Sequence, residues 1–164
     1  MSFPYDDARP QLLLDARAPS AAPRRLPAGV TVRVVAAGDP GLASALAVTR
    51  VAYGDPGTVA GIARALAETG ELAEVAEGVR YGRRIVAAAF DADDVALAAA
   101  HCSPDGEVHT VGTLPAARRL GLAYEVTRVL LDEARGRGQR AFHLTAETPE
   151  AELLYASLGF RKSG

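Results

Sequence analysis

Three short apolar runs separated by tight-turn sequences occupy the middle of the chain and limit the folds open to it. RRIVAAAF (83–90) and VALAAAHC (95–102) flank the tetrapeptide DADD, and SPDG (103–106) leads into EVHTVGTLP (107–115). Apolar runs of this length between turns rich in Asp, Gly and Pro are typical of strands joined as hairpins. We therefore expect a three-stranded antiparallel meander over residues 83–115.

The residues after the meander predict a crossover to a parallel strand. Residues 116–137 carry an apolar stripe at helical spacing, which includes Leu122, Val126 and Leu130. RAFHLTAE (140–147) then has the pattern of a strand. A strand, a helix and a further strand in this order favour a right-handed crossover, with 107–115 and 140–147 parallel.

The remaining elements follow from alternation and from helix-start residues. The run beginning at Val30 alternates as a strand does, and two GDPG tetrapeptides (38–41 and 54–57) place Asp before Pro. We expect helices over about 40–52 and 57–77, with Asp as N-cap and an interruption at Gly70. Thr148 followed by Pro149 predicts the start of a last helix, which ends near Gly159.

The N-terminal residues differ in composition from the rest. Residues 1–29 hold five of the ten prolines, and QLLL (11–14) is their compact apolar segment. We expect residues 1–29 to form an extended, partly docked arm and residues 30–164 to form one domain, which suits a chain of 164 residues.

Charge and cysteine content exclude several classes of function. A net charge of −2 and an isoelectric point near 5.9 disfavour nucleic-acid binding. The single cysteine, Cys102, leaves no internal disulfide and suits a reducing, cytoplasmic setting. The chain shows neither a membrane-spanning apolar run nor a secretory signal, so we expect no membrane association.

An arginine pair at the start of the helix predicted over 116–137 points to an anion. Arg118 and Arg119 oppose the helix dipole at that end, whereas Gly121 would let a ligand approach the backbone. The residues alone leave two interpretations open, namely a phosphate-binding site or two solvated arginines on an ordinary helix.

Two motifs at this end of the chain resemble the GNAT family of N-acetyltransferases. Arg118-x-x-Gly121-x-Ala123, after a strand that ends in VGTLP, resembles the acyl-CoA-binding signature of the family. TAETPEAELLYASLGF (145–160) resembles its second characteristic block, a strand followed by a helix that ends in Leu-Tyr-x-x-Leu-Gly-Phe. The resemblance covers about residues 30–164. It implies an α+β fold with a mixed, mostly antiparallel sheet and a splayed parallel strand pair, 107–115 and 140–147.

The resemblance also implies that acetyl-CoA, or another acyl-CoA, is the co-substrate. Its pyrophosphate would bind the backbone amides of residues 120–123, with both arginines assisting, and its pantetheine would pair with residues 111–113. The sequence differs from the usual pattern of the family at three positions. Arg119 stands where family members often have Gly, Leu120 where a basic residue is common, and Thr148 where many members have an Asn that contacts the cofactor. The implied cofactor-binding residues are Val111, Gly112, Thr113, Arg118, Arg119, Leu120, Gly121, Leu122, Ala123 and Thr148.

Three residues are candidates for catalysis. Tyr155 matches a tyrosine that protonates the CoA sulfur in many family members, although its position on an apolar helix face also suits core packing. Glu107 stands at a spacing from Arg118 at which some members carry a base, and His109, two residues on, points to the same face. A solvated Glu107 is the alternative. His101, His143 and Cys102 form no motif with the spacing of metal ligands, so we expect no metal.

The function implied is transfer of an acetyl or longer acyl group to the primary amine of a small molecule or peptide. A non-catalytic acyl-CoA-binding or regulatory module on the same fold is the alternative. The acidic residues of 40–81 suit a cationic amine. The short tail after Phe160 leaves little final strand, so a homodimer partner is a candidate to complete that edge.

Overall fold

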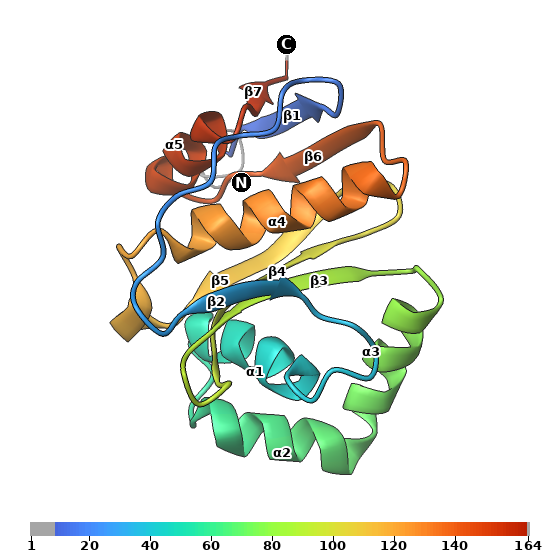
Figure 1. Cartoon of the computed structure of the whole chain (residues 1–164), viewed down its shortest axis with the longest axis vertical. Coiled ribbons are helices and arrows are strands. Elements are labelled where there is room, and N and C mark those ends of the chain that lie inside the picture. Colours follow the sequence, from blue (N-terminus) through green and yellow to red (C-terminus); the bar gives the residue numbers. More distant parts are fainter. Residues whose placement is uncertain (1–8, 164) are drawn as a thin grey trace, which may run out of the picture.

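The computed structural model describes residues 9–163 and contains two sheets (Figure 1). The larger sheet has the order β2 (Thr31–Val34), β3 (Ile85–Phe90), β4 (Ala96–Cys102) and β5 (Val108–Thr113), with antiparallel neighbours throughout. The smaller sheet places β1 (Gln11–Asp15) between β6 (Ala141–Thr145) and β7 (Arg161–Lys162), and β1 is antiparallel to both. The predicted meander is therefore confirmed as β3, β4 and β5.

Helices cover both faces of the larger sheet. Figure 1 shows α1 (Leu42–Ala52), α2 (Val59–Thr69) and α3 (Glu71–Arg80) on one face, and α4 (Leu122–Gly136) on the other, between the two sheets. Strands β3 and β4 are alanine-rich and almost wholly buried. Their alternate residues pack into two hydrophobic cores, one on each face of the sheet. Small side chains let helices pack closely on each side. The predicted α+β class is confirmed.

Strands β5 and β6 meet at one end and then separate into different sheets. A single parallel bridge joins Glu107 to His143, and the His143 amide donates to the Gly106 carbonyl at 3.1 Å. Gly106 has φ +90°, and a Cβ there would lie 2.2 Å from the Ala141 carbonyl oxygen. The parallel direction predicted for these strands is confirmed, and the larger part of the β5 edge that faces β6 is left unpaired by strands.

Several predicted helix boundaries are wrong. The interruption predicted at Gly70 is confirmed, since Gly70 takes a left-handed conformation at φ +85° and divides the segment into α2 and α3, but α3 continues to Arg80. The predicted Asp N-caps are also displaced. Gly41 is the N-cap of α1, while Asp39 accepts from its amide and pairs with Arg33. Thr58 caps α2 by accepting from the Gly61 amide.

The N-terminal segment contributes a strand to the smaller sheet. The apolar segment QLLL of the arm predicted over residues 1–29 forms most of β1. Leu12 and Leu14 are buried in the core beneath β1, whereas Leu13 is exposed. The short strand β7, at the end of the chain, pairs with β1 of the same chain. Residues 1–8 of the predicted arm lie outside the described residues.

Candidate functional site

A cavity of about 520 Å³ opens where β5 and β6 part. It is bounded by β5, by the loop and helix that follow β6, and by the C-terminal end of α1. It brings together nine of the residues singled out from the sequence, and these are Glu107, His109, Val111, Gly112, Thr113, Arg118, Ala123, Thr148 and Tyr155. Tyr53 and Glu147 also line this cavity.

A bulge in β5 shapes the wall of the cavity. The pairing of β5 with β4 shifts register between His109 and Gly112, and Thr110 adopts φ +54° within this interval. A non-glycine residue with positive φ in a strand is uncommon, and such residues are frequent at functional sites. The bulge interrupts regular pairing beside the cavity, so backbone groups of β5 become available to a ligand.

Gly112 lets helix α1 approach β5 closely. A Cβ at this position would lie 3.0 Å from the Ala52 Cβ, which is tighter than nearly all real contacts of that kind. Tyr53 follows α1 directly, and its hydroxyl donates to the Val111 carbonyl at 2.8 Å. The glycine in the strand thus brings the tyrosine over the cavity.

Helix α4 begins at Leu122, six residues later than predicted, and the loop before it is irregular. Residues Pro115–Ala117 form a 3-10 turn, Arg118 is extended, and Arg119 and Gly121 have φ +67° and +78°. Gly121 is the N-cap and provides no side-chain cap. The first amides of α4 therefore lack the acceptor that a Ser, Thr or Asp would supply, and they lie at the positive end of the helix dipole.

A second cavity of about 320 Å³ continues the first around this helix start. The two share five lining residues, which are Thr113, Arg118, Ala123, Glu150 and Leu154. Arg119, Gly121 and Leu122 line the second cavity, as does Arg24 from the N-terminal part of the chain. Leu120 is exposed and lines neither cavity. The groove therefore runs from Tyr155, past the β5 edge, to an arginine-rich end.

Solved structures that share this architecture include N-acetyltransferases. A GCN5-related N-acetyltransferase from Kribbella flavida superposes with a TM-score of 0.62 at 23% identity, covering 94% of this chain and 54% of that one. One from Sphaerobacter thermophilus gives 0.65 at 19% identity, with coverage of 94% and 48%. A Trypanosoma brucei acetyltransferase gives 0.59 at 19% identity, with coverage of 82% and 94%. The chain has the GNAT fold.

A match to a family model agrees with this GNAT fold. The model of the FR47-like protein family matches residues 86–163, the part that carries both motifs. The resemblance to the GNAT family seen in the sequence is confirmed. No curated protein matches the chain significantly in sequence. The chain spans about half the length of the first two solved structures named above.

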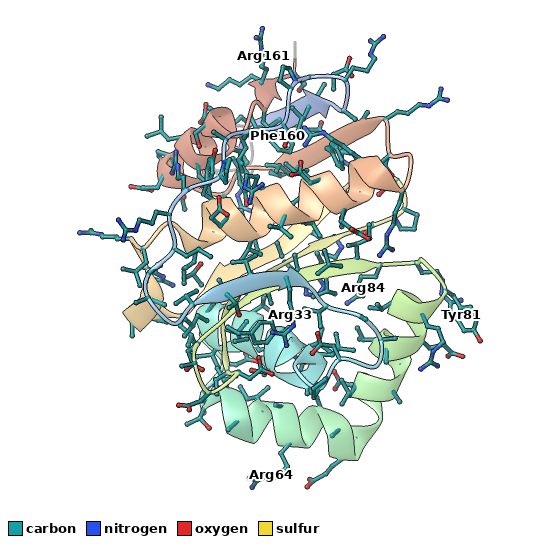
Figure 2. All side chains as sticks on the ribbon, in the orientation of Figure 1. Arg33, Arg64, Tyr81, Arg84, Phe160 and Arg161 are labelled. Atoms are coloured by element: carbon teal, nitrogen blue, oxygen red, sulfur yellow. The ribbon has the colours of Figure 1, made fainter. Side chains whose placement is uncertain are left out.

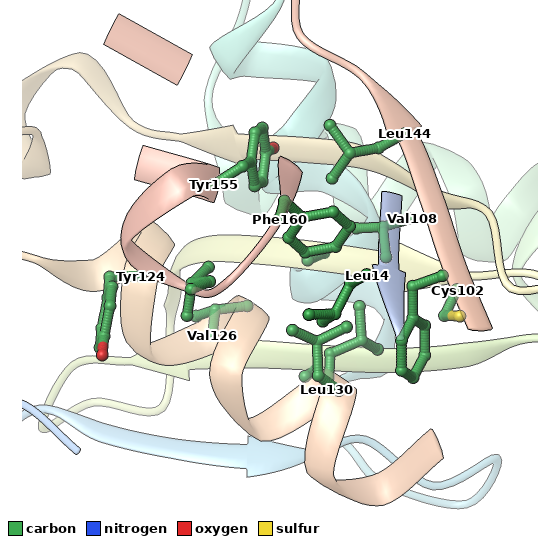
Figure 3. Close-up of a cluster of buried hydrophobic side chains, with 14 of the residues drawn as sticks. Leu14, Cys102, Val108, Tyr124, Val126, Leu130, Leu144, Tyr155 and Phe160 are labelled. Atoms are coloured by element: carbon green, nitrogen blue, oxygen red, sulfur yellow. The ribbon is translucent and has the colours of Figure 1, made fainter. Parts of the chain in front are cut away.

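Tyr155 combines core packing with access to the cavity of this GNAT fold. Its ring packs edge-on against Phe160, with ring centroids 5.8 Å apart (Figure 3), and the residue lines the larger cavity. Burial, with smaller contributions from Tyr53 and Glu147, raises the pKa of the phenol well above its ordinary value. The hydroxyl is therefore protonated at neutral pH and able to donate a hydrogen bond.

The two candidate bases lie together on the cavity wall but differ in their surroundings. Glu107 is exposed. His109 is half-buried, and hydroxyl groups contact both of its ring nitrogens, Ser103 Oγ at 2.9 Å from Nε2 and Thr110 Oγ1 at 2.7 Å from Nδ1. Burial and the charge of Arg84 lower the pKa of His109, against a smaller opposing effect of Glu107 and Asp105. Its neutral form, which can accept a proton, is thus favoured at neutral pH.

The two motifs assigned no role to four residues that the fold brings to these cavities. Tyr53 and Glu147 both line the larger cavity. Burial raises the pKa of the Tyr53 phenol, and the negative charge of Glu147 makes a smaller contribution in the same direction. Thr110 contacts His109, and Arg24 lines the smaller cavity. Glu147 offers one sequence signal, because it directly precedes the Thr148 cap. Tyr53 and Arg24 are distant in sequence from both motifs and offer none.

The other histidines and the cysteine lie outside the cavities. His101 and Cys102 are buried, and burial raises the pKa of the Cys102 thiol to about 11, as expected of a packed cysteine. His143 Nε2 lies 3.6 Å from Asp105 Oδ2. Among residues 9–163, no cluster of three or more candidate metal ligands occurs, and no helix has the length and apolarity needed to cross a membrane.

Proposed function

We propose that the protein transfers an acetyl group from acetyl-CoA to a primary amine of a small molecule or peptide. The observation that carries this proposal is the continuity of one groove, in which an arginine-rich helix start, an unpaired strand edge and a buried tyrosine follow one another. This order matches the phosphates, the pantetheine arm and the thioester of acyl-CoA.

Each part of the groove suits one part of the co-substrate. The uncapped amides at the start of α4, together with Arg118 and Arg119, suit the pyrophosphate. Residues 111–113 of β5 lie on an edge without a strand partner, to which the pantetheine amides can pair as a strand would, and the Val111 carbonyl there also accepts from the Tyr53 hydroxyl. Thr148 uses its side chain to accept from the Ala151 amide, so it acts first as a helix cap.

The cavity residues can move both protons of the reaction. A free alkylamine with a pKa of about 10.4 is neutral only about once in 2,500 molecules at pH 7, so a base assists. The amine nitrogen attacks the thioester carbonyl carbon and yields its proton to His109 or Glu107. The carbon–sulfur bond then breaks, the amide product forms, and Tyr155 donates to the sulfur that leaves.

The charge of the cavity suits a cationic acceptor. Three carboxylates line it, from Glu107, Glu147 and Glu150, and Glu147 acts on the pKa of both tyrosines there. Carboxylates attract an ammonium group from solution before it loses its proton. We therefore propose a primary amine that is cationic in solution.

The test is release of free CoA thiol from acetyl-CoA in the presence of a panel of amines, with binding of CoA measured by calorimetry. We expect amine-dependent thiol release and loss of CoA binding in Arg118→Glu. Arg64→Glu is the matched control, because Arg64 is exposed on α2, at the end of the molecule away from α4 (Figure 2). CoA binding without thiol release would support the binding-module alternative, and unchanged CoA affinity in Arg118→Glu would overturn the proposed site.

A further inference from the structure

The segment between β1 and β2 runs along α4 and ends at the arginine-rich end of the groove. We name residues 16–30 the α4 strap (Figure 1). Ser20 Oγ bonds to Asp132 Oδ1, and the Tyr124 hydroxyl donates to the Ala22 carbonyl at 2.7 Å. The Arg24 amide donates to Glu125 Oε1 at 2.6 Å. These bonds connect the strap from the C-terminal half of α4 to its first turn.

Arg24 is the residue that the strap contributes to the smaller cavity. Its Cζ lies 3.7 Å from the centroid of the Tyr124 ring, so the guanidinium stacks on the aromatic face. Stacking fixes the plane of the group and leaves its N–H edge available for an acceptor. The Glu125 carboxylate nearby is already engaged by Arg128, through Nε–Oε1 and Nη2–Oε2 contacts of 2.9 Å each.

Three arginines thus converge on one cavity from two segments far apart in sequence. Arg24 joins Arg118 and Arg119 in the lining, and none of the three forms an ion pair with an acidic side chain within residues 9–163. All three are exposed at the cavity, so their guanidinium groups are accessible to an anionic ligand that enters it. Glu150 also lines the cavity, but its single carboxylate balances only one of the three guanidinium charges, so the lining keeps an excess of positive charge.

We propose that Arg24 is a third phosphate ligand for acyl-CoA, so that the α4 strap forms part of the nucleotide-binding site. This inference rests on the proposed function. Arg24 would also supply a basic group at the smaller cavity, whereas Leu120, at the position where a basic residue is common in the family, is exposed and does not line this cavity. CoA carries phosphate at two places, the pyrophosphate and the ribose 3′-phosphate, and an arginine fork suits either.

The test compares CoA and 3′-dephospho-CoA in calorimetric titrations of the wild type and Arg24→Ala. We expect Arg24→Ala to weaken CoA binding by about tenfold or more, as loss of a hydrogen bond to a charged group does. Arg25→Ala is the matched control, because Arg25 is the next residue on the strap, is exposed like Arg24, and lines neither cavity. Arg24→Gln serves as a second variant that keeps the length of the side chain.

The two ligands separate the two phosphates. If Arg24 contacts the 3′-phosphate, Arg24→Ala and the wild type should bind dephospho-CoA with equal affinity. If Arg24 contacts the pyrophosphate, Arg24→Ala should lose the same affinity for both ligands. Either result supports the inference. Wild-type affinity for both ligands in both Arg24 variants would overturn it. If the Arg24 variants bind both ligands normally but Arg118→Glu does not bind CoA, the inference about Arg24 fails and the proposed function survives. A wild type that binds neither ligand would overturn both.

Discussion

At the residue scale, the most specific proposal is that Tyr155 is the proton donor. Replacing it with Phe keeps the ring that packs on Phe160 and removes only the hydroxyl. We expect Tyr155→Phe to lower kcat by about 100-fold, the low end for loss of general acid catalysis, with CoA affinity unchanged. Steady-state kinetics with calorimetric binding check this. A large loss of CoA affinity with normal kcat would instead assign Tyr155 to binding alone.

His101 makes stability depend on pH. Burial, with smaller contributions from Arg84 and His109, lowers its pKa to about 3, and its Nε2 is buried without a hydrogen-bond partner. Between pH 6.5 and pH 3 the unfolded chain binds a proton there that the folded chain does not. The free energy of unfolding should therefore fall, by roughly 1 kcal/mol per pH unit at most from this group, as pH decreases through this window.

Urea unfolding of wild type and His101→Leu over this pH range measures that dependence. Leucine has a similar volume and no titratable group, so His101→Leu should lose this contribution while other groups keep theirs. Curves of equal slope for the two proteins would show that another group causes the pH dependence.

At the element scale, the sequence indicated the arginine-lined cavity, which we propose as the phosphate site, better than it indicated the start of the helix. The pattern Arg118-x-x-Gly121 marked the right end of α4, because arginines at a helix start are unfavourable without an anion. The predicted start at residue 116 was wrong, since the alanine and arginine run before Gly121 has helical propensity that the local backbone overrides. Arg119 takes φ +67°, a conformation that propensity does not predict.

The junction of β5 and β6 depends on Gly106. Its φ is +90°, and an added Cβ would overlap the Ala141 carbonyl oxygen at 2.2 Å. Gly138 has a similar φ of +96°, with nothing within 4 Å of an added Cβ, and so isolates the cost of conformation. We expect Gly138→Ala to cost about 1–2 kcal/mol of unfolding free energy. Gly106→Ala should cost about 1–3 kcal/mol more, through overpacking.

Urea denaturation of both glycine variants gives this comparison. The excess cost of Gly106→Ala should be accompanied by weaker CoA binding, because the groove opens from this junction. Equal losses of stability in the two variants would mean that the backbone adjusts without strain at Gly106.

At the scale of the whole molecule, local patterns predicted most elements but not all of their partners. The meander, the crossover and the last helix are formed by neighbours in sequence, and their apolar periodicities identify them. The pairing of β1 with β6 and β7 joins residues more than 120 positions apart, and three successive leucines hide the alternation of buried Leu12 and Leu14 with exposed Leu13. Tyr53 and Arg24 reach the groove through similar long-range packing, so the two motifs gave no indication of them.

The strand β1 should therefore be part of the stable core. Leu14 is 3% exposed and packs beneath the smaller sheet, whereas its neighbour Leu13 is 46% exposed on the opposite face. Leu14→Ala should lower the free energy of unfolding by about 2–5 kcal/mol, and Leu13→Ala should change it by less than about 0.5 kcal/mol. Urea unfolding followed by circular dichroism measures both. If Leu14→Ala matched Leu13→Ala, β1 would be a docked arm of the kind that composition suggests, and the smaller sheet would not depend on it. A large effect confined to Leu14→Ala would instead show that the sheet containing β6 needs the N-terminal strand.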